Sequence, residues 1–123
     1  MKMNMKRAYL VMLVALFLVI AAAVAVYCTT EHFPVYGISM APTFKNGTNV
    51  LVLKGTWGIK PGDIIVFPYS VIHPSTNITC THRVIDTTTN ASGTFFLTQG
   101  DNNGEPDGWV PAASVIGKVI WIW

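Results

Sequence analysis

The chain has 123 residues, of which 51% are hydrophobic, and a formal net charge of +2. A chain of this length forms one domain with a modest core. The positive charge is confined to the N-terminus, since Lys2, Lys6 and Arg7 precede the first acidic residue, Glu31, and the remainder has five basic against six acidic residues. The composition therefore argues against a nucleic-acid-binding protein.

The first element is a long apolar run from Ala8 to Cys28, with no charged residue, proline or glycine. A helix of 21 residues rises about 30 Å, which matches the hydrocarbon thickness of a bilayer. Tyr9 and Tyr27 lie at its two ends, where aromatic rings settle at the lipid headgroups. We therefore expect a single transmembrane helix over 8–28.

The basic residues before this span predict its orientation. Positive charge stays on the cytoplasmic side, so residues 1–7 are expected in the cytoplasm and a β-rich domain, residues 29–123, outside it. Ala23-Val24-Ala25 has the small-x-small pattern of a signal-peptide cleavage site. The apolar run is longer than a usual signal-peptide core, which favours a retained anchor in the cell membrane or the endoplasmic-reticulum membrane.

Short β-prone runs follow the span, separated by glycine and proline turns. They predict strands at 35–38, 49–53, 64–67, 78–86, 94–98 and 114–123. The run at 64–67 is apolar enough for both faces to be buried. A polar turn is expected at 87–93 and an irregular loop at 104–111. The pattern indicates an all-β domain, in the form of a small barrel or coiled sheet.

The sequence gives little sign of disulfides, metals or cofactors. Two cysteines, Cys28 and Cys80, do not make a disulfide framework, and we expect two free, buried thiols. No Cys/His cluster has zinc spacing, and the acidic spacing in the glycine-flanked loop 100–108 does not follow an EF-hand. We expect neither a metal nor a cofactor.

One hydroxyl stands out as a possible nucleophile. Ser39 lies in Gly37-Ile-Ser-Met-Ala-Pro-Thr43, about ten residues beyond the span. A serine nucleophile needs a base and, usually, a group that orients that base. His82 is the candidate base because strand alternation places it on one face with Cys80 and Val84. The structural alternatives are a surface serine and a half-buried strand histidine bonded to a carbonyl.

Two carboxylates could orient His82. Asp101 and Asp107 both lie in the glycine-flanked loop, and the residues alone do not choose between them. Asp63 instead ends the turn Lys60-Pro-Gly-Asp63 and is expected to cap that turn.

Four segments in order resemble the boxes of type I signal peptidases: Gly37–Thr43, Pro61–Phe67 (Pro-Gly-Asp-Ile-Ile-Val-Phe), Thr81–Ile85 (Thr-His-Arg-Val-Ile) and Thr98–Asn103 (Thr-Gln-Gly-Asp-Asn-Asn) with Asp107. The last two look like the archaeal and endoplasmic-reticulum branch, in which histidine stands where the bacterial branch has lysine. Together with the N-terminal span, the resemblance covers nearly all of the chain.

The resemblance implies a serine endopeptidase that removes signal peptides from exported preproteins. Ser39 would be the nucleophile, His82 the general base, Asp107 the third member and Asp101 a carboxylate that organises the site. The extended substrate would add as a strand beside Val35, Tyr36, Gly37 and Ile38, with pockets beside Ser39, at Met40 among others, that select small residues at positions −1 and −3.

This interpretation leaves two alternatives open. One is a catalytically silent, membrane-anchored β-domain that binds exported chains or a partner subunit. The other is a secreted binding module. The expected partners are preprotein signal peptides and the lipid bilayer, without nucleic acid, and accessory subunits are left open.

Overall fold

The computed structural model describes residues 2–123 and divides the chain after Thr30. The N-terminal unit is one helix, α1 (Met5–Thr29), whose first turn is capped by Asn4, because the Asn4 side chain accepts a hydrogen bond from the Lys6 N–H. The helix is long and apolar enough to cross a membrane, and none of its residues is buried. It extends the predicted span by three residues at its start and one at its end.

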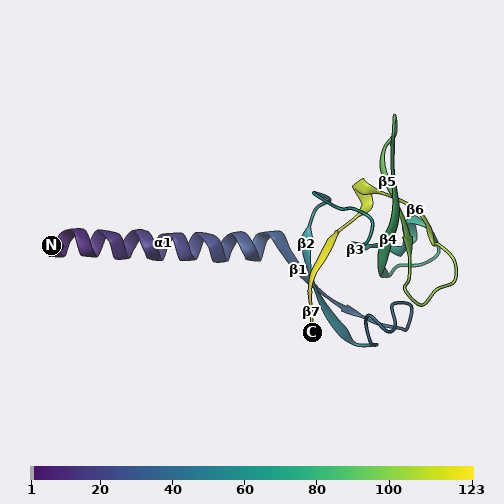
Figure 1. Cartoon of the computed structure of the whole chain (residues 1–123), viewed down its shortest axis with the longest axis horizontal. Helices are drawn as coiled ribbons and strands as arrows, with labels where there is room; N and C mark the ends of the chain where they lie inside the picture. The colour runs from purple at the N-terminus through teal and green to yellow at the C-terminus, as the bar shows by residue number, and fades with distance from the viewer. Residues whose placement is uncertain (1) are drawn as a thin grey trace. The chain divides into compact units, whose positions relative to one another are not determined.

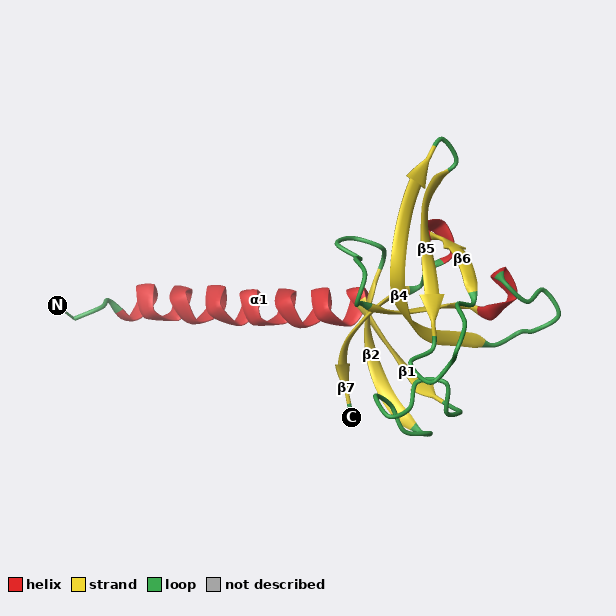
Figure 2. Cartoon of the chain, turned by 45° about the vertical axis from the view of Figure 1, so that its right-hand side comes forward, coloured by secondary structure: helices red, strands yellow, loops and turns green. Residues whose placement is uncertain are grey.

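The unit from Glu31 to Trp123 is all-β, as predicted, with two short 3-10 turns (Figures 1 and 2). Its strands are β1 (Thr30–Val35), β2 (Thr48–Lys54), β3 (Ile64–Pro68), β4 (Thr79–Asn90), β5 (Gly93–Gln99), β6 (Gly108–Pro111) and β7 (Gly117–Ile122). They form one seven-stranded sheet in the order β1-β2-β7-β3-β4-β5-β6. Strands distant in sequence therefore become neighbours, since β7 lies between β2 and β3.

The sheet coils so that its two faces enclose two hydrophobic clusters. One cluster contains Ile65 and Phe67, and the other contains Val66, so β3 is buried on both faces. This confirms the prediction made from its uninterrupted apolar run. Because β3 lies at the centre of the sheet order, it fixes β4, its antiparallel partner on one side.

Several element boundaries differ from the predictions. The strand expected at 114–123 begins at Gly117, because Ala112–Ser114 forms a 3-10 turn. The strand expected at 35–38 ends at Val35, and residues 36–38 lie outside it, because Gly37 takes a positive φ of 91° that breaks the extended backbone. The turn expected at 87–93 is shorter, since β4 runs to Asn90 and β5 begins at Gly93, joined by cross-strand pairs such as Thr88 with Phe95. The loop expected at 104–111 ends in β6, which pairs with β5.

The cysteine prediction is half right. Both thiols are free, and Cys80 is buried, but Cys28 is exposed because it lies near the end of α1, a helix without buried residues.

Candidate active site

Ser39 lies in a turn that the core holds on its C-terminal side. The side chains of Met40 and Phe44 are almost fully buried in the cluster around Val66. Backbone hydrogen bonds from Ala41 N to the Ile38 carbonyl and from Phe44 N to the Met40 carbonyl close the turn at 3.0 Å each. Ser39 itself stays half-buried, so its hydroxyl is accessible while its backbone is fixed.

His82 connects the hydroxyl to a carboxylate. Its Nε2 lies 3.0 Å from the Ser39 Oγ, and its Nδ1 lies 2.6 Å from the Asp107 Oδ2. Because an ionised carboxylate only accepts hydrogen bonds, the imidazole donates from Nδ1, and Nε2 is left to accept the serine proton. We call these three residues the Ser–His–Asp array. The alternation along β4 places His82 on the buried face with Cys80 and Val84, as predicted.

Asp107 enters the array from the loop after β5, immediately before β6. Its backbone N–H donates to the Thr98 carbonyl at 2.8 Å, which aligns it with the end of β5. The side chains of His82 and Asp107 are each only 7% exposed, so their hydrogen bond is shielded from water. Charge-assisted bonds of this kind are short and strong.

Thr98 is a residue that the sequence analysis missed. It is fully buried, and its hydroxyl donates to the same Asp107 oxygen that His82 contacts, at 2.8 Å. The signal available in the sequence was its strand position: a threonine nine residues before an aspartate, with a glycine-rich loop between them, reaches that aspartate only if the two strands pair.

Asp101 has a different set of hydrogen-bond partners. Its carboxylate takes two hydrogen bonds from the Arg83 guanidinium at 2.8 Å each and one from the Thr43 hydroxyl at 2.5 Å. The hydrogen bonds from Arg83 in particular hold the pKa of Asp101 below its ordinary value. Arg83 also donates to the Gly62 carbonyl, so the group ties β4 to two turns. Of the two carboxylates, Asp107 is the one that hydrogen-bonds to His82.

Asp63 caps its own turn, as predicted. Its carboxylate accepts a hydrogen bond from the Lys60 N–H at 2.9 Å. It also lies 3.9 Å from the Lys118 ammonium, away from the Ser–His–Asp array.

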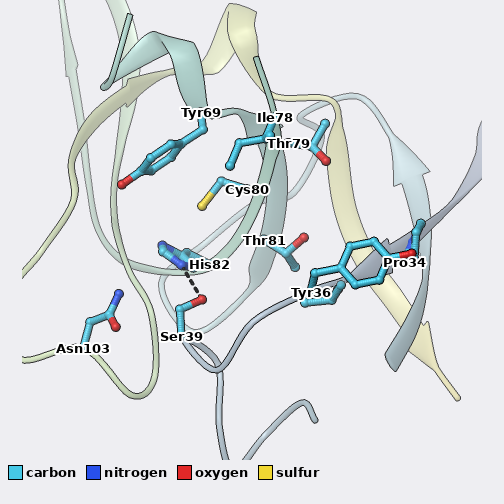
Figure 3. Close-up of a pocket in the computed structure, with 11 residues that line it drawn as sticks. Pro34, Tyr36, Ser39, Tyr69, Ile78, Thr79, Cys80, Thr81, His82 and Asn103 are labelled. Carbon is cyan, nitrogen blue, oxygen red and sulfur yellow. Dashed lines mark hydrogen bonds between the residues drawn. The ribbon is translucent and has the colours of Figure 1, made fainter. Parts of the chain in front are cut away.

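A cleft of about 520 Å³ opens beside Ser39 and His82 (Figure 3). Its lining residues come from the end of β1, the loop before β4, the first half of β4, and the loop after β5; they are Pro34, Val35, Tyr36, Ser39, Tyr69, Ile78, Thr79, Cys80, Thr81, His82 and Asn103. Of the residues expected to contact substrate, Val35 and Tyr36 line this cleft. Gly37 and Ile38 are exposed outside its lining, and the Met40 side chain packs in the core.

The charge of the array affects the groups around it. Burial, followed by the nearby Asp107 carboxylate, raises the pKa of the Cys80 thiol to about 12. The same two causes raise the pKa of the Tyr69 hydroxyl. Both side chains therefore face the cleft in their neutral forms at neutral pH, which leaves its wall beside His82 largely apolar.

No group of three or more histidine, cysteine or acidic side chains that could hold a metal ion occurs in residues 2–123. Ser39 and His82 line the cleft, and the buried Asp107 carboxylate is hydrogen-bonded to His82 behind them. This is the arrangement of serine hydrolases, and here it lies on a coiled β-sheet that follows an apolar helix.

The comparisons with known proteins narrow this class. Residues 6–89 match the family described as signal peptidase, peptidase S26, and the chain belongs to that family. Over 71 residues it is 35% identical to signal peptidase I W of Bacillus subtilis (strain 168), an alignment that covers 56% of this chain. The chain spans 35% of the length of that relative.

The family match covers the helix and two members of the array. Ser39 and His82 fall within residues 6–89, whereas Asp101 and Asp107 lie beyond them. The assignment of a third member therefore depends on the geometry at His82 and not on the family match.

Proposed function

We propose that this chain is a membrane-anchored serine endopeptidase that removes N-terminal signal peptides from exported preproteins. The observation that carries the proposal is the Ser–His–Asp array, which lies beside an open cleft in a chain of the signal peptidase family. The histidine next to the serine supports placing the chain in the archaeal and endoplasmic-reticulum branch.

The proposed mechanism begins with proton transfer from Ser39 to His82. As the Ser39 oxygen attacks the scissile carbonyl, Nε2 accepts its proton and then returns it to the departing amine. Asp107 keeps the proton of the neutral imidazole on Nδ1 and stabilises the imidazolium that forms. Water then hydrolyses the acyl-enzyme by the same route. A candidate donor to the oxyanion is the Ser39 backbone N–H.

The proposed substrate lies extended in the cleft. β1 is an edge strand of the sheet, and β4 pairs with β5 only from Arg83 onward, so β1 and the stretch Thr79–Thr81 each have one free strand edge, and residues of both line the cleft. An extended peptide could add to these edges as a further strand. This shifts the proposed contact from residues 35–38 to the end of β1. Small side chains at positions −1 and −3 are the preference that the family resemblance implies.

The anchor explains why the nucleophile lies so soon after an apolar helix. Ten residues connect Cys28 to Ser39, and they reach at most about 35 Å when fully extended. Ser39 therefore stays near the membrane surface, where the cleavage site of a signal peptide also emerges from its own apolar segment. With Lys2, Lys6 and Arg7 on the cytoplasmic side, the β unit would act on the outer side.

The test is cleavage of a preprotein by the detergent-solubilised full chain. We expect Ser39→Ala and His82→Ala to abolish cleavage and Asp107→Asn to lower kcat by up to about 10⁴-fold, because the wrong tautomer is then favoured. Exposed residues of the same types provide the matched controls, Ser92→Ala and Asp86→Asn. Cleavage that persists in Ser39→Ala would exclude the mechanism, and an inactive wild-type chain would favour the silent binding domain.

A further inference from the structure

The proposed reaction needs more than one donor to the oxyanion. Tetrahedral intermediates in acyl transfer are stabilised by preorganised donors, commonly two, and removal of one costs about 10²–10³-fold in kcat. We propose that the side-chain amide of Asn103 is the second donor, and that Asn103 is therefore a further catalytic residue. This inference rests on the proposed function.

Asn103 and Ser39 reach the cleft from different loops: Ser39 lies in the turn after β1. Asn103 lies in the loop after β5, yet it lines the same cleft as Ser39 and His82. In Figure 3 Asn103 lies across from Ser39, and its amide nitrogen points toward the side on which Tyr69 and His82 stand. It is thus an amide donor that lines the same cleft as the nucleophile. The loop that carries it also carries Asp107.

Two hydrogen bonds fix the Asn103 backbone. Its N–H donates to the Gly100 carbonyl at 2.9 Å, and its carbonyl accepts from the Gln99 side-chain amide at 2.6 Å. The loop is also tied to the nucleophile, because the Asn102 N–H donates to the Ser39 carbonyl at 2.8 Å. These bonds hold the backbone that carries the Asn103 amide in the loop beside Ser39.

Gly100 brings the Asn103 amide close to Ser39. A Cβ placed on Gly100 would lie 2.6 Å from the Asn103 Nδ2 and 2.6 Å from the Ser39 carbonyl oxygen. Both groups therefore pack over the same glycine. Within residues 2–123 the hydrogen bonds of Asn103 involve its backbone, which leaves the side-chain amide for a ligand in the cleft.

The chemistry of the step balances without a cofactor. The Ser39 oxygen forms a bond to the carbonyl carbon, the proton passes to His82, and the π electrons of the carbonyl move to its oxygen. That oxygen carries the new negative charge, which the Ser39 N–H and the Asn103 amide would stabilise. Since the charge exists only after attack, Asn103 should affect kcat and leave substrate affinity unchanged.

The experiment measures kcat and KM of the full chain in detergent, with a preprotein substrate. We expect Asn103→Ala and Asn103→Asp to lower kcat by about 100-fold with little change in KM. Glu105→Ala, an exposed change in the same loop, serves as the control and should stay within about threefold of wild type. Unchanged kcat in Asn103→Ala would overturn the assignment. Thr81 also lines the cleft and carries a hydroxyl donor, so a loss of kcat in Thr81→Val in place of Asn103→Ala would overturn it as well.

A second measurement separates catalysis from loop structure. A substrate-like peptide aldehyde adds to Ser39 and forms an oxyanion, whereas the corresponding peptide alcohol binds without an adduct. Asn103→Ala should weaken the aldehyde about as much as it lowers kcat and leave the alcohol unaffected. Equal weakening of both would mean that the variant disturbs the cleft, and it would refute a specific oxyanion contact.

The two proposals fail in different ways. A wild-type chain that cuts no preprotein, or a Ser39→Ala variant that still cuts, removes the proposed function and the inference together. A wild-type chain with Ser39-dependent cleavage and an Asn103→Ala variant of full kcat removes the inference alone.

Discussion

At the residue scale, the site depends on which hydrogen bonds the carboxylate of Asp107 accepts. One oxygen, Oδ2, accepts both the His82 Nδ1–H and the Thr98 hydroxyl, at 2.6 and 2.8 Å. Two donors from different strands leave that carboxylate a narrow range of positions. Thr98 thus acts on His82 through Asp107, and we assign it as a positioning residue of the proposed reaction.

Replacement of Thr98 by the isosteric valine should reveal this role. Thr98→Val removes the hydroxyl without changing the side-chain volume, so we expect kcat to fall by about 10- to 100-fold, the value of one hydrogen bond to a charged group. Thr98→Ser should restore most of the activity, because it returns the donor. Equal activity in the valine and serine variants would contradict a positioning role, and thermal unfolding of both would control for stability.

At the element scale, the loop after β5 is clamped to the turn that carries Ser39. Arg83 on β4 binds Asp101 in that loop, and Asp101 in turn accepts a hydrogen bond from Thr43, four residues after Ser39. The Asp101 N–H also lies 3.4 Å from the Met40 sulfur as a donor. Asp101 therefore links the loop after β5 to the nucleophile turn, and the organising role that the family resemblance implies for it stays part of the proposal.

The stability contributed by this clamp should depend on pH in a defined direction. Arg83 lowers the pKa of Asp101 in the folded state, so its ionised form stabilises the fold. That contribution is fully present above the ordinary carboxyl pKa of about 3.9 and is lost as the pH falls through the folded value. We expect Asp101→Asn to lower the unfolding free energy at pH 7, with a difference from wild type that shrinks below about pH 4.

Urea unfolding of both proteins across this pH range measures the effect. The control is Asp86→Asn, at an exposed position whose carboxylate accepts a hydrogen bond from the neighbouring Thr87 N–H. A difference between Asp101→Asn and wild type that stays constant down to pH 3 would contradict the assignment.

The close approach of Gly100 to the turn that carries Ser39 predicts a requirement for glycine at position 100. A Cβ there would meet the Ser39 carbonyl oxygen at 2.6 Å, and that atom is backbone that cannot move aside without shifting the nucleophile. We expect Gly100→Ala to destabilise the chain by about 1–3 kcal/mol and to reduce cleavage. Gly104→Ala, in the same loop, meets no atom within 4 Å and should preserve both properties. Similar melting temperatures and rates for the two variants would refute the close packing.

At the scale of the whole molecule, an apolar helix precedes a β unit that carries the site. The helix and the family membership together indicate a membrane-anchored protein. The side of the membrane on which the β unit lies follows from the basic residues before the helix, and this remains part of the proposal.

Protease protection tests that topology. In sealed vesicles with the cytoplasmic side outward, a tag at the N-terminus should be digested by added protease, and the unit from Glu31 onward should be protected until detergent is added. We expect replacement of Lys2, Lys6 and Arg7 by glutamate to weaken or reverse this pattern, because the positive charge that retains the N-terminus is lost. Protection of the N-terminal tag in wild type would contradict the orientation.

Local patterns determined much of this protein before any contact was known. An uninterrupted apolar run of 21 residues predicts a helix long enough to cross a bilayer, and the structure forms such a helix over Met5–Thr29. β-Prone runs and turn residues predicted most of the strands, and alternation along β4 placed His82 on a buried face. The ordered boxes identified Ser39 and His82 as candidates for one site.

Only the tertiary structure decided which groups touch. Asp101 and Asp107 lie six residues apart in one loop, and apart from the family resemblance nothing in the sequence chose between them, because the choice depends on how β5 pairs with β6. That pairing directs Asp107 onto His82 and leaves Asp101 to Arg83. It also buries Thr98 against Asp107 and brings Asn103 to the cleft, at separations of 43 residues or more from Ser39 that no local pattern encodes. Contacts of this kind arise from long-range packing, and they decide the geometry of the site.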